Sequence, residues 1–494
     1  MRAGALQPGS IPVSLKTVTR MRIAMSRPFA ASLLLSISLC LSDSSVAEPA
    51  PVADPIAITH VTVLPMTPAA TPLTDMTVII RNGRIASISP TAGARVPAGT
   101  RTISGRGKWL MPGFADMHMH LENDRMGRLH VGDPTLPDGT FTLEDALTPY
   151  LANGILQVFS LASMSETIGQ RVEVESGRVL GPHIATAAMI DGSPPMWPLG
   201  MTRAAATPED GRQAVRDAKA EGYEFIKVYS KLTLETFTAI VDEARQQKMR
   251  VVGHIPGRGQ GITEKFFQPG FDLVAHAEEF AQHTDPPDQS AIPRYVEMAK
   301  RNGTWLVATL TLDERIAEEM RDPDSLKRRS ELRHMHPKAY NMVLNDNPYL
   351  KDRSAGRLAY VQAIVDFNCP LVRAFVEAGV PVLTGTDAPV PGVAPGFALH
   401  DEFESLSRCG MSNLQVLEST TRLAAEWLGT IKDRGTVEPG KRADLVLLDA
   451  NPLENISNTR RIAAVITNGH YLPRVELDRR LRRIADRIGT PAAQ

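Results

Sequence analysis

Two patterns of hydrophobic and polar positions divide this chain. Near the N-terminus, short apolar runs at residues 58–64, 76–80 and 84–89 follow one another without a helical segment between them. Asn82-Gly83 is a typical hairpin turn between the last two runs. From residue 113 to about residue 428, apolar runs instead alternate with segments of helical period. The chain is therefore expected to contain a small β domain and a larger α/β domain.

The α/β segment contains eight strand candidates. They are residues 114–120, 155–161, 183–187, 225–230, 250–255, 272–277, 305–310 and 381–387. Helix boundary signals lie between them: Thr207 and Pro208 can begin a helix that Gly222 ends, and Gly379 ends the helix before the eighth strand. Eight strands joined by crossover helices predict a (β/α)8 barrel.

The strand pattern returns beyond Gly429, at residues 444–448 and 462–467. We expect these strands to pair with the N-terminal ones. The predicted fold class is therefore α/β, a (β/α)8 TIM barrel with a small β-sandwich domain built from both chain ends. The expected segments are a signal peptide at 1–47, the β domain at 48–112 and 429–474, the barrel at 113–428, and a solvated C-terminal helix or tail at 475–494.

The first residues have the features of a secretory signal. Arginines precede an apolar run at 29–41, and Ser45 and Ala47 are small residues at the −3 and −1 positions of a cleavage site before Glu48. The run is too short for a membrane-spanning helix. We therefore expect a protein without a stable membrane span after cleavage, exported to the periplasm or secreted.

Composition excludes some partners and leaves other questions open. The formal net charge of −1 and the pI of about 6.9 favour neither nucleic acid nor an anionic surface as a partner. Three cysteines are too few for a disulfide scaffold. Cys369 and Cys409 could be free or paired, and the oligomeric state stays open. A small molecule is the expected partner.

Residues that bind metals lie where the barrel strands are expected to end. His118 and His120 are one residue apart on a strand, so their side chains point to the same face. Four more candidates sit in later strands: Lys227, His254, His276 and Asp387. Active residues of such barrels gather at the C-terminal ends of the strands. Together these six residues predict a metal site.

The motifs around these residues resemble those of the amidohydrolase superfamily. PGFADMHMH, ending at His120, is similar to its HxH signature, AHAEEF contains the strand-six histidine His276, and TGTDAP contains the strand-eight aspartate Asp387. The run GTVEPGKRADLVLLDANPLENI is similar to the C-terminal signature of the imidazolonepropionase-like and prolidase-like branch. In that branch a lysine matching Lys227 is carboxylated and bridges two metals.

The resemblance implies a site with two divalent ions. His118, His120, Lys227 and Asp387 would hold one, and Lys227 as N6-carboxylysine, His254 and His276 the other. Zinc is the default for these ligands, with manganese or cobalt as alternatives. The ions would activate a shared water, with Asp387 as general base and then acid. The alternative is a Lys227 ammonium paired with Asp387 and a site with one metal or none.

Substrate contacts are expected around this site. Tyr229 shares the face of Lys227 and could bind the developing oxyanion or a substrate carboxylate, although a packed barrel tyrosine is the alternative. His183, His283 and Trp197 are further candidates. The loops at 121–140, 191–197 and 311–369 are long enough to determine the substrate.

The expected function is hydrolysis of a carbon–nitrogen bond. We expect an exported, metal-dependent amidohydrolase that acts on an amide, a dipeptide or an N-acyl amino acid, and the resemblance implies a prolidase-like dipeptidase. Hydrolysis of a lactone, an ester, a phosphotriester or a cyclic amide on the same metal site is the alternative.

Overall fold

The structure is a computed structural model that describes residues 55–69, 71–121 and 141–488. The predicted signal peptide, almost all of the predicted loop at 121–140 and the residues after 488 lie outside this range. Within the described range, no helix is both long enough and apolar enough to cross a membrane.

Eight parallel strands form the barrel, and all eight were predicted. In spatial order they are β6 (Phe114–Met119), β7 (Ile155–Leu161), β8 (His183–Asp191), β10 (Phe225–Val228), β11 (Arg250–Gly253), β12 (Phe271–Ala275), β13 (Trp305–Val307) and β14 (Val382–Leu383). The first and last strands meet through a bridge between Met119 and Ala388 and a hydrogen bond from Met117 N–H to Thr384 O of 2.9 Å. The predicted (β/α)8 barrel is confirmed.

Apolar side chains fill the inside of the barrel at its N-terminal end. The Trp427 ring, from helix α14 (Arg422–Leu428), stacks on Phe225 with ring centroids 5.3 Å apart and lies 5.5 Å from Phe159. All three side chains are buried. Because Phe225 is the first residue of β10, these rings form an apolar plug at the N-terminal end of the strands.

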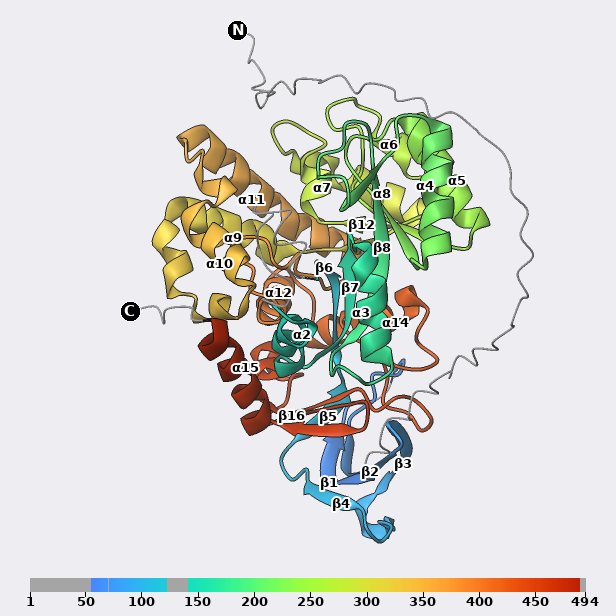
Figure 1. The fold of residues 1–494 in the computed structure, drawn as a ribbon, viewed down its shortest axis with the longest axis vertical. Coiled ribbons are helices and arrows are strands. Elements are labelled where there is room, and N and C mark those ends of the chain that lie inside the picture. The colour runs from blue at the N-terminus through green and yellow to red at the C-terminus, as the bar shows by residue number, and fades with distance from the viewer. Residues whose placement is uncertain (1–54, 70, 122–140, 489–494) are drawn as a thin grey trace, which may run out of the picture. The chain divides into compact units, whose positions relative to one another are not determined.

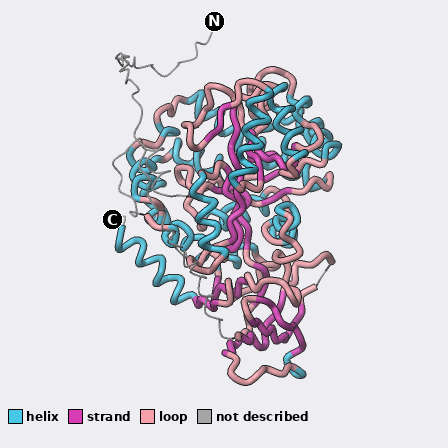
Figure 2. The backbone as a smooth tube through the Cα atoms, turned by 45° about the vertical axis from the view of Figure 1, so that its right-hand side comes forward, coloured by secondary structure: helices cyan, strands magenta, loops and turns pink. Residues whose placement is uncertain are grey.

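Helices connect the strands and lie on their outer side (Figure 2). The predicted boundaries around α4 are present: the Thr207 side chain accepts a hydrogen bond from Asp210 N–H, Pro208 is the first helical residue, and Gly222 ends the helix with φ 96°. The helices before α14 are α2 (Leu143–Ala152), α3 (Ser165–Glu175), α4 (Pro208–Glu221), α5 (Leu234–Gln246), α6 (Thr263–Phe266), α7 (Glu278–Ala281), α8 (Ile292–Asn302), α9 (Leu310–Arg321), α10 (Pro337–Asn345), α11 (Ala355–Glu377), α12 (Ala398–Arg408) and α13 (Asn413–Ser419).

A second sheet joins strands from both chain ends, as predicted. Its order is β17-β16-β15-β5-β1-β2-β3, with β4 beside β1, and Figure 1 shows its blue and red strands together. The bounds are β1 (Ile56–Val63), β2 (Leu73–Arg81), β3 (Arg84–Pro90), β4 (Arg101–Ser104), β5 (Trp109–Pro112), β15 (Leu445–Leu448), β16 (Ile462–Thr467) and β17 (His470–Pro473). Residues of β1, β2, β5, β15 and β16 share one buried cluster, so the sheet has its own apolar core.

The C-terminal helix α15 (Arg474–Ile488) is not the solvated helix that we expected. Its apolar residues Leu477, Leu481 and Ile484 are buried, and they recur at the spacing of one helix face. Arg480 also pairs with Glu144 of α2 at 2.8 Å. The prediction of a solvated helix rested on the high charge of the segment and overlooked a narrow apolar stripe. This stripe packs against the rest of the domain.

Cys369 and Cys409 form a disulfide, which answers the question that the sequence left open. The bond joins α11 to the residue that follows α12, across a sequence separation of 40, with Cα atoms 4.8 Å apart. It therefore fixes two of the helices outside the barrel to each other.

Candidate metal centre

The six predicted metal-binding residues converge at the C-terminal end of the barrel. His118 Nε2 and His120 Nε2 lie 3.0 Å and 2.9 Å from the same oxygen, Oδ1 of Asp387. Lys227 Nζ lies 3.3 Å from His118 Nε2. The first, fourth and eighth strands therefore contribute to one cluster.

Two more histidines complete the cluster. The rings of His276 and His118 lie 4.4 Å apart, and those of His254 and His276 lie 5.1 Å apart. Donor atoms of His118, His276 and Asp387 all lie within 4.8 Å of one another. Imidazole nitrogens and a carboxylate oxygen in this arrangement suit a divalent ion of the zinc class.

The backbone is strained at two of these residues. His276 has φ 79° and Asp387 has φ 62°, a left-handed conformation that non-glycine residues seldom adopt and that recurs at functional sites. Gly385 lets the strand-eight segment approach closely, because a Cβ there would lie 2.5 Å from Val307 Cγ2 and 3.0 Å from His118 N. The glycine of the TGTDAP motif thus has a packing role beside the site.

Burial keeps His118, His254 and His276 neutral. It lowers the pKa of His118 to about 3 and lowers the pKa of His254 and of His276. Burial raises the pKa of Asp387, but the electrostatic interactions with His118 and His276 and the hydrogen bonds with His118 and His120 outweigh it and hold that pKa well below its usual range. Neutral imidazoles and an ionised carboxylate are the protonation states that metal binding requires.

Lys227 is buried, and within the described part of the chain it has no ion-pair partner. Its residue is 2% exposed, and burial lowers the pKa of its ammonium to about 8. Among the described residues, its Nζ contacts are His118 and the Tyr229 ring, whose centroid lies 5.5 Å away, and no carboxylate lies within ion-pair distance. The salt bridge to Asp387, our alternative for this lysine, is absent from the described contacts.

Further side chains fix the orientation of the histidines, and sequence reasoning missed them. His254 Nδ1 lies 2.9 Å from both Glu279 Oε1 and Ser230 Oγ, and His276 Nδ1 lies 2.8 Å from Thr309 Oγ1. Carboxylate and hydroxyl partners of this kind orient the ligand face of a histidine. Glu279 stands in the AHAEEF motif, so its proximity in sequence to His276 was the available signal.

Asp116 is a further residue that the sequence analysis missed. Its carboxylate accepts hydrogen bonds from Thr386 Oγ1 at 2.7 Å and from His118 N–H at 3.2 Å, and it is fully buried. Burial raises its pKa to about 7. Asp116 therefore joins the first and last strands directly behind His118 and Asp387. An acidic residue inside an apolar strand was its signal in the sequence.

The ring of Tyr229 packs against the ring of His254. Its ring centroid is 4.0 Å from that of His254, and its hydroxyl hydrogen-bonds to the Trp197 indole. Burial raises the pKa of Tyr229, so the hydroxyl keeps its proton. The structure thus brings two of the predicted substrate residues, Tyr229 and Trp197, together beside the site.

The two other predicted contacts lie elsewhere. His183 is the first residue of β8 and bonds to Glu175, so it lies at the opposite end of the barrel from the site, and this prediction was wrong. The strand predicted at 183–187 was too short at its C-terminal end, because β8 continues to Asp191. His283 bonds through both ring nitrogens, to Thr263 Oγ1 at 2.8 Å and to Ile255 O at 3.0 Å. It therefore ties down the loop that carries His254.

The long segment after β13 contributes Tyr349, which the sequence analysis did not single out. Its ring packs on an apolar cluster that includes Ala388, the neighbour of Asp387. Asn347 Oδ1 accepts a hydrogen bond from Tyr349 N–H at 3.0 Å, and Asn347 Nδ2 donates to buried Glu319 at 2.9 Å. A buried polar anchor thus holds Tyr349 near the site.

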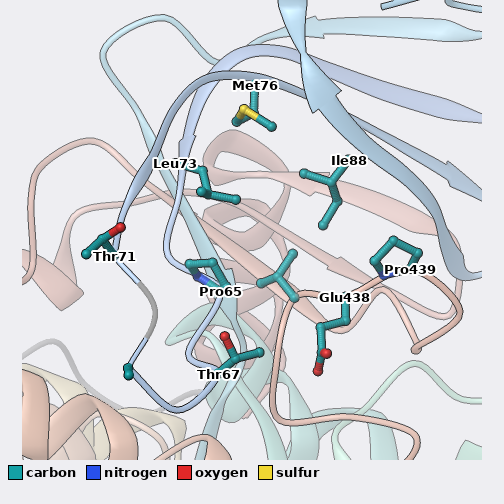
Figure 3. Close-up of a pocket in the computed structure, with 10 residues that line it drawn as sticks. Pro65, Thr67, Thr71, Leu73, Met76, Ile88, Glu438 and Pro439 are labelled. Carbon is teal, nitrogen blue, oxygen red and sulfur yellow. The ribbon is translucent and has the colours of Figure 1, made fainter.

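A separate hollow of about 530 Å³ lies on the second sheet, the one that joins strands from both chain ends (Figure 3). Its labelled lining includes Leu73, Met76, Ile88, Pro439 and Glu438. None of the metal-site residues contributes to it. It is therefore distinct from the metal centre.

Comparisons with known proteins agree with this geometry. A model described as Amidohydrolase family matches residues 109–472. A crystal structure titled putative prolidase from Bifidobacterium longum is 25% identical, with a TM-score of 0.65, and the match covers 88% of this chain and 100% of that one.

Curated relatives match over different lengths. Ochratoxinase of Aspergillus niger is 23% identical over 393 residues, 70% of this chain and 71% of that protein. Imidazolonepropionase of Shouchella clausii is 44% identical over 81 residues, 16% of this chain and 17% of that protein. The chain thus spans less than a fifth of the length of the imidazolonepropionase and adenine deaminase relatives that it matches.

Proposed function

The chain belongs to the amidohydrolase family, as a hydrolase acting on carbon–nitrogen bonds, and from this premise we propose that it cleaves the amide bond of a dipeptide or an N-acyl amino acid. The observation that carries the proposal is the meeting of four histidines, Lys227 and Asp387 at the C-terminal end of one barrel. Relatives named prolidase and ochratoxinase support an amide as the substrate.

The donor set fits two divalent ions, with zinc as the default. His118, His120 and Asp387 would hold one, His254 and His276 the other, and Lys227 would contact both. The shifted pKa values of His118, His254, His276 and Asp387 support this assignment, because these four groups are in the protonation states that bind a metal. Such ions, when bound, supply Lewis acidity that polarises a carbonyl and makes water more acidic.

Lys227 is suited to carboxylation. Because its pKa is lowered to about 8, the side chain loses its proton more readily than an ordinary lysine, and the lone pair of the neutral amine can attack the carbon of CO2. A nitrogen–carbon bond forms, a proton leaves the nitrogen, and a carbamate anion results. The anion has two oxygens for two cations, and it removes the cost of burying an unpaired ammonium.

Asp387 and Tyr229 can supply the two further functions that amide hydrolysis requires, which are proton transfer and a hydrogen bond to the carbonyl oxygen. The Asp387 carboxylate is ionised, so it can take a proton from the attacking water and return it to the leaving nitrogen. The protonated Tyr229 hydroxyl can donate a hydrogen bond to the substrate carbonyl oxygen as charge develops there. The hydrogen bond with the Trp197 indole fixes the direction of the Tyr229 hydroxyl.

A panel of dipeptides, N-acyl amino acids, lactones and phosphotriesters tests this proposal on the purified protein. We expect turnover of amides, and Asp387→Asn should lower kcat by about 10³-fold or more because the proton carrier is lost. Asp217→Asn, an exposed carboxylate on α4, is the matched control and should be neutral. Turnover of lactones or phosphotriesters alone would contradict the proposal.

Export is the second part of the proposal. The signal-like N-terminus motivates it, and the Cys369–Cys409 disulfide supports it, because disulfides persist mainly in oxidising compartments. Mass spectrometry of the protein from its native host should find a mature chain beginning at Glu48 outside the cytosol. An uncleaved chain in the cytosol would contradict export without affecting the proposed chemistry.

A further inference from the structure

The loop after β8 exposes apolar side chains beside the metal centre. Met196 is 55% exposed, Trp197 39% and Leu199 69%. They are three of the eight exposed large hydrophobic residues in the described part of the chain, and no other loop there has more than one of them in so short a stretch. Clustered exposed apolar residues mark ligand-binding surfaces more often than scattered ones.

The loop is held rigidly in this position. Asp191, fully buried at the end of β8, accepts hydrogen bonds from Met196 N–H at 2.9 Å and from Lys231 N–H at 2.8 Å. Lys231 Nζ donates to Pro194 O at 3.1 Å. A Cβ at Gly192 would lie 2.2 Å from Lys231 O, so the two loops touch. The exposed side chains are therefore presented by an anchored backbone.

The loop also reaches the reacting groups. Lys231 follows Tyr229 by two residues, and the Trp197 indole hydrogen-bonds to the Tyr229 hydroxyl. The Tyr229 ring lies on His254, with centroids 4.0 Å apart. The apolar surface is thus continuous with the proposed carbonyl-binding group, and a substrate bound at Tyr229 would extend along it.

We propose that Met196, Trp197 and Leu199 form an apolar wall that selects amides with a bulky apolar group next to the scissile bond. This inference rests on the proposed amide hydrolysis and adds the class of substrate. Contact with the wall removes apolar area of both partners from water, so affinity rises with the size of that group. Trp197 has a second role, as a positioning residue for the Tyr229 hydroxyl.

Two pairs of dipeptides test the wall, each pair differing in one apolar side chain. Glycyl-proline and phenylalanyl-proline vary the acyl side, and alanyl-glycine and alanyl-phenylalanine vary the leaving side. The wild type should prefer the bulky member of at least one pair in kcat/KM. Met196→Ala and Trp197→Ala should each reduce that preference by about 10-fold, chiefly through KM, which is the usual size for a pocket contact.

Trp197→Phe separates the two roles of the tryptophan. It keeps an apolar ring and loses the N–H group, so the preference should persist while kcat falls equally for both members of a pair. Leu414→Ala, which removes a leucine that is 46% exposed on α13, is the control and should change neither quantity.

The outcomes distinguish this inference from the proposed function. If the metal-loaded wild type hydrolyses no amide, the proposed function and the wall fail together. If it hydrolyses amides and the alanine variants keep the wild-type preference, only the wall is wrong. A changed oligomeric mass with unchanged preference would likewise overturn it and assign the apolar surface to contacts between copies.

Discussion

The two ends of the barrel differ in chemistry although the same eight strands form both. At the N-terminal end, the rings of Trp427, Phe225 and Phe159 form the apolar plug, and the Arg250 guanidinium lies over the Trp427 ring, 5.5 Å from its centroid. At the C-terminal end, buried histidines, Lys227 and Asp387 meet, with strained backbone at two positions. One strand can therefore contribute stability at its start and chemistry at its end.

Lys227→Ala should produce the largest effect, and this effect should be limited to the C-terminal end of the barrel. We expect kcat/KM to fall by about 10³-fold or more because the shared ligand is lost. Elemental mass spectrometry should find about two metal ions in the wild type and fewer in the variant. Equal metal content in both proteins would mean that Lys227 is not a ligand.

Trp427→Ala should produce the reverse pattern. Removing the central ring of the apolar plug should lower the free energy of unfolding by about 3–5 kcal/mol, the usual cost of deleting a large buried side chain. Denaturant unfolding measures this, and metal content per folded molecule should be unchanged. A loss of metal without a loss of stability would contradict the division between the two ends.

Glu279→Gln should have a smaller effect on the C-terminal end. The charge of the group that lies 2.9 Å from His254 Nδ1 is removed, while its shape is retained. Metal affinity should fall by about 10–100-fold, as is typical when a partner of a metal ligand is changed. Competition with a chelator gives the affinity, and Glu235→Gln, exposed on α5, is the control.

Glu175→Gln should have the smallest effect and act at the N-terminal end. The hydrogen bond with His183 lowers the pKa of Glu175 from 4.5 to about 2. A lowered carboxyl pKa stabilises the fold above the unfolded-state value, and this contribution disappears as the pH falls from about 4.5 towards 2. The pair is partly exposed, so we expect a loss of about 1 kcal/mol or less at pH 7. Melting curves at pH 7 and pH 3 should show the difference shrinking.

The sequence predicted what depends on periodicity and local motifs. The eight strands follow from short apolar runs, and the alternation of side chains places His118 and His120 on one face, where both reach Asp387. Their meeting with His254, His276 and Lys227 follows from the shared end of parallel strands. These predictions needed no knowledge of contacts between distant residues.

The remaining features depend on such contacts. Asp116 meets Thr386 across 270 residues, and the Asn347–Glu319 anchor of Tyr349 lies in an insertion that follows no repeating pattern. Cysteine spacing did not determine whether Cys369 pairs with Cys409, because pairing depends on how two helices pack. The error at His183 had a simpler cause, because the predicted strand already began at His183, and the first residue of a barrel strand lies at the end away from the site.

The second sheet joins strands from both chain ends, and this affects the order in which the protein can fold. Lys108 and Asp449, which pair beside β5 and β15, are 341 residues apart in the chain. During synthesis β5 must wait for the 341 residues that separate Lys108 from Asp449, so this sheet can be completed only after the chain of the barrel has been made. Chains truncated before β15 would leave the β5 edge unpaired, an exposed template for aggregation.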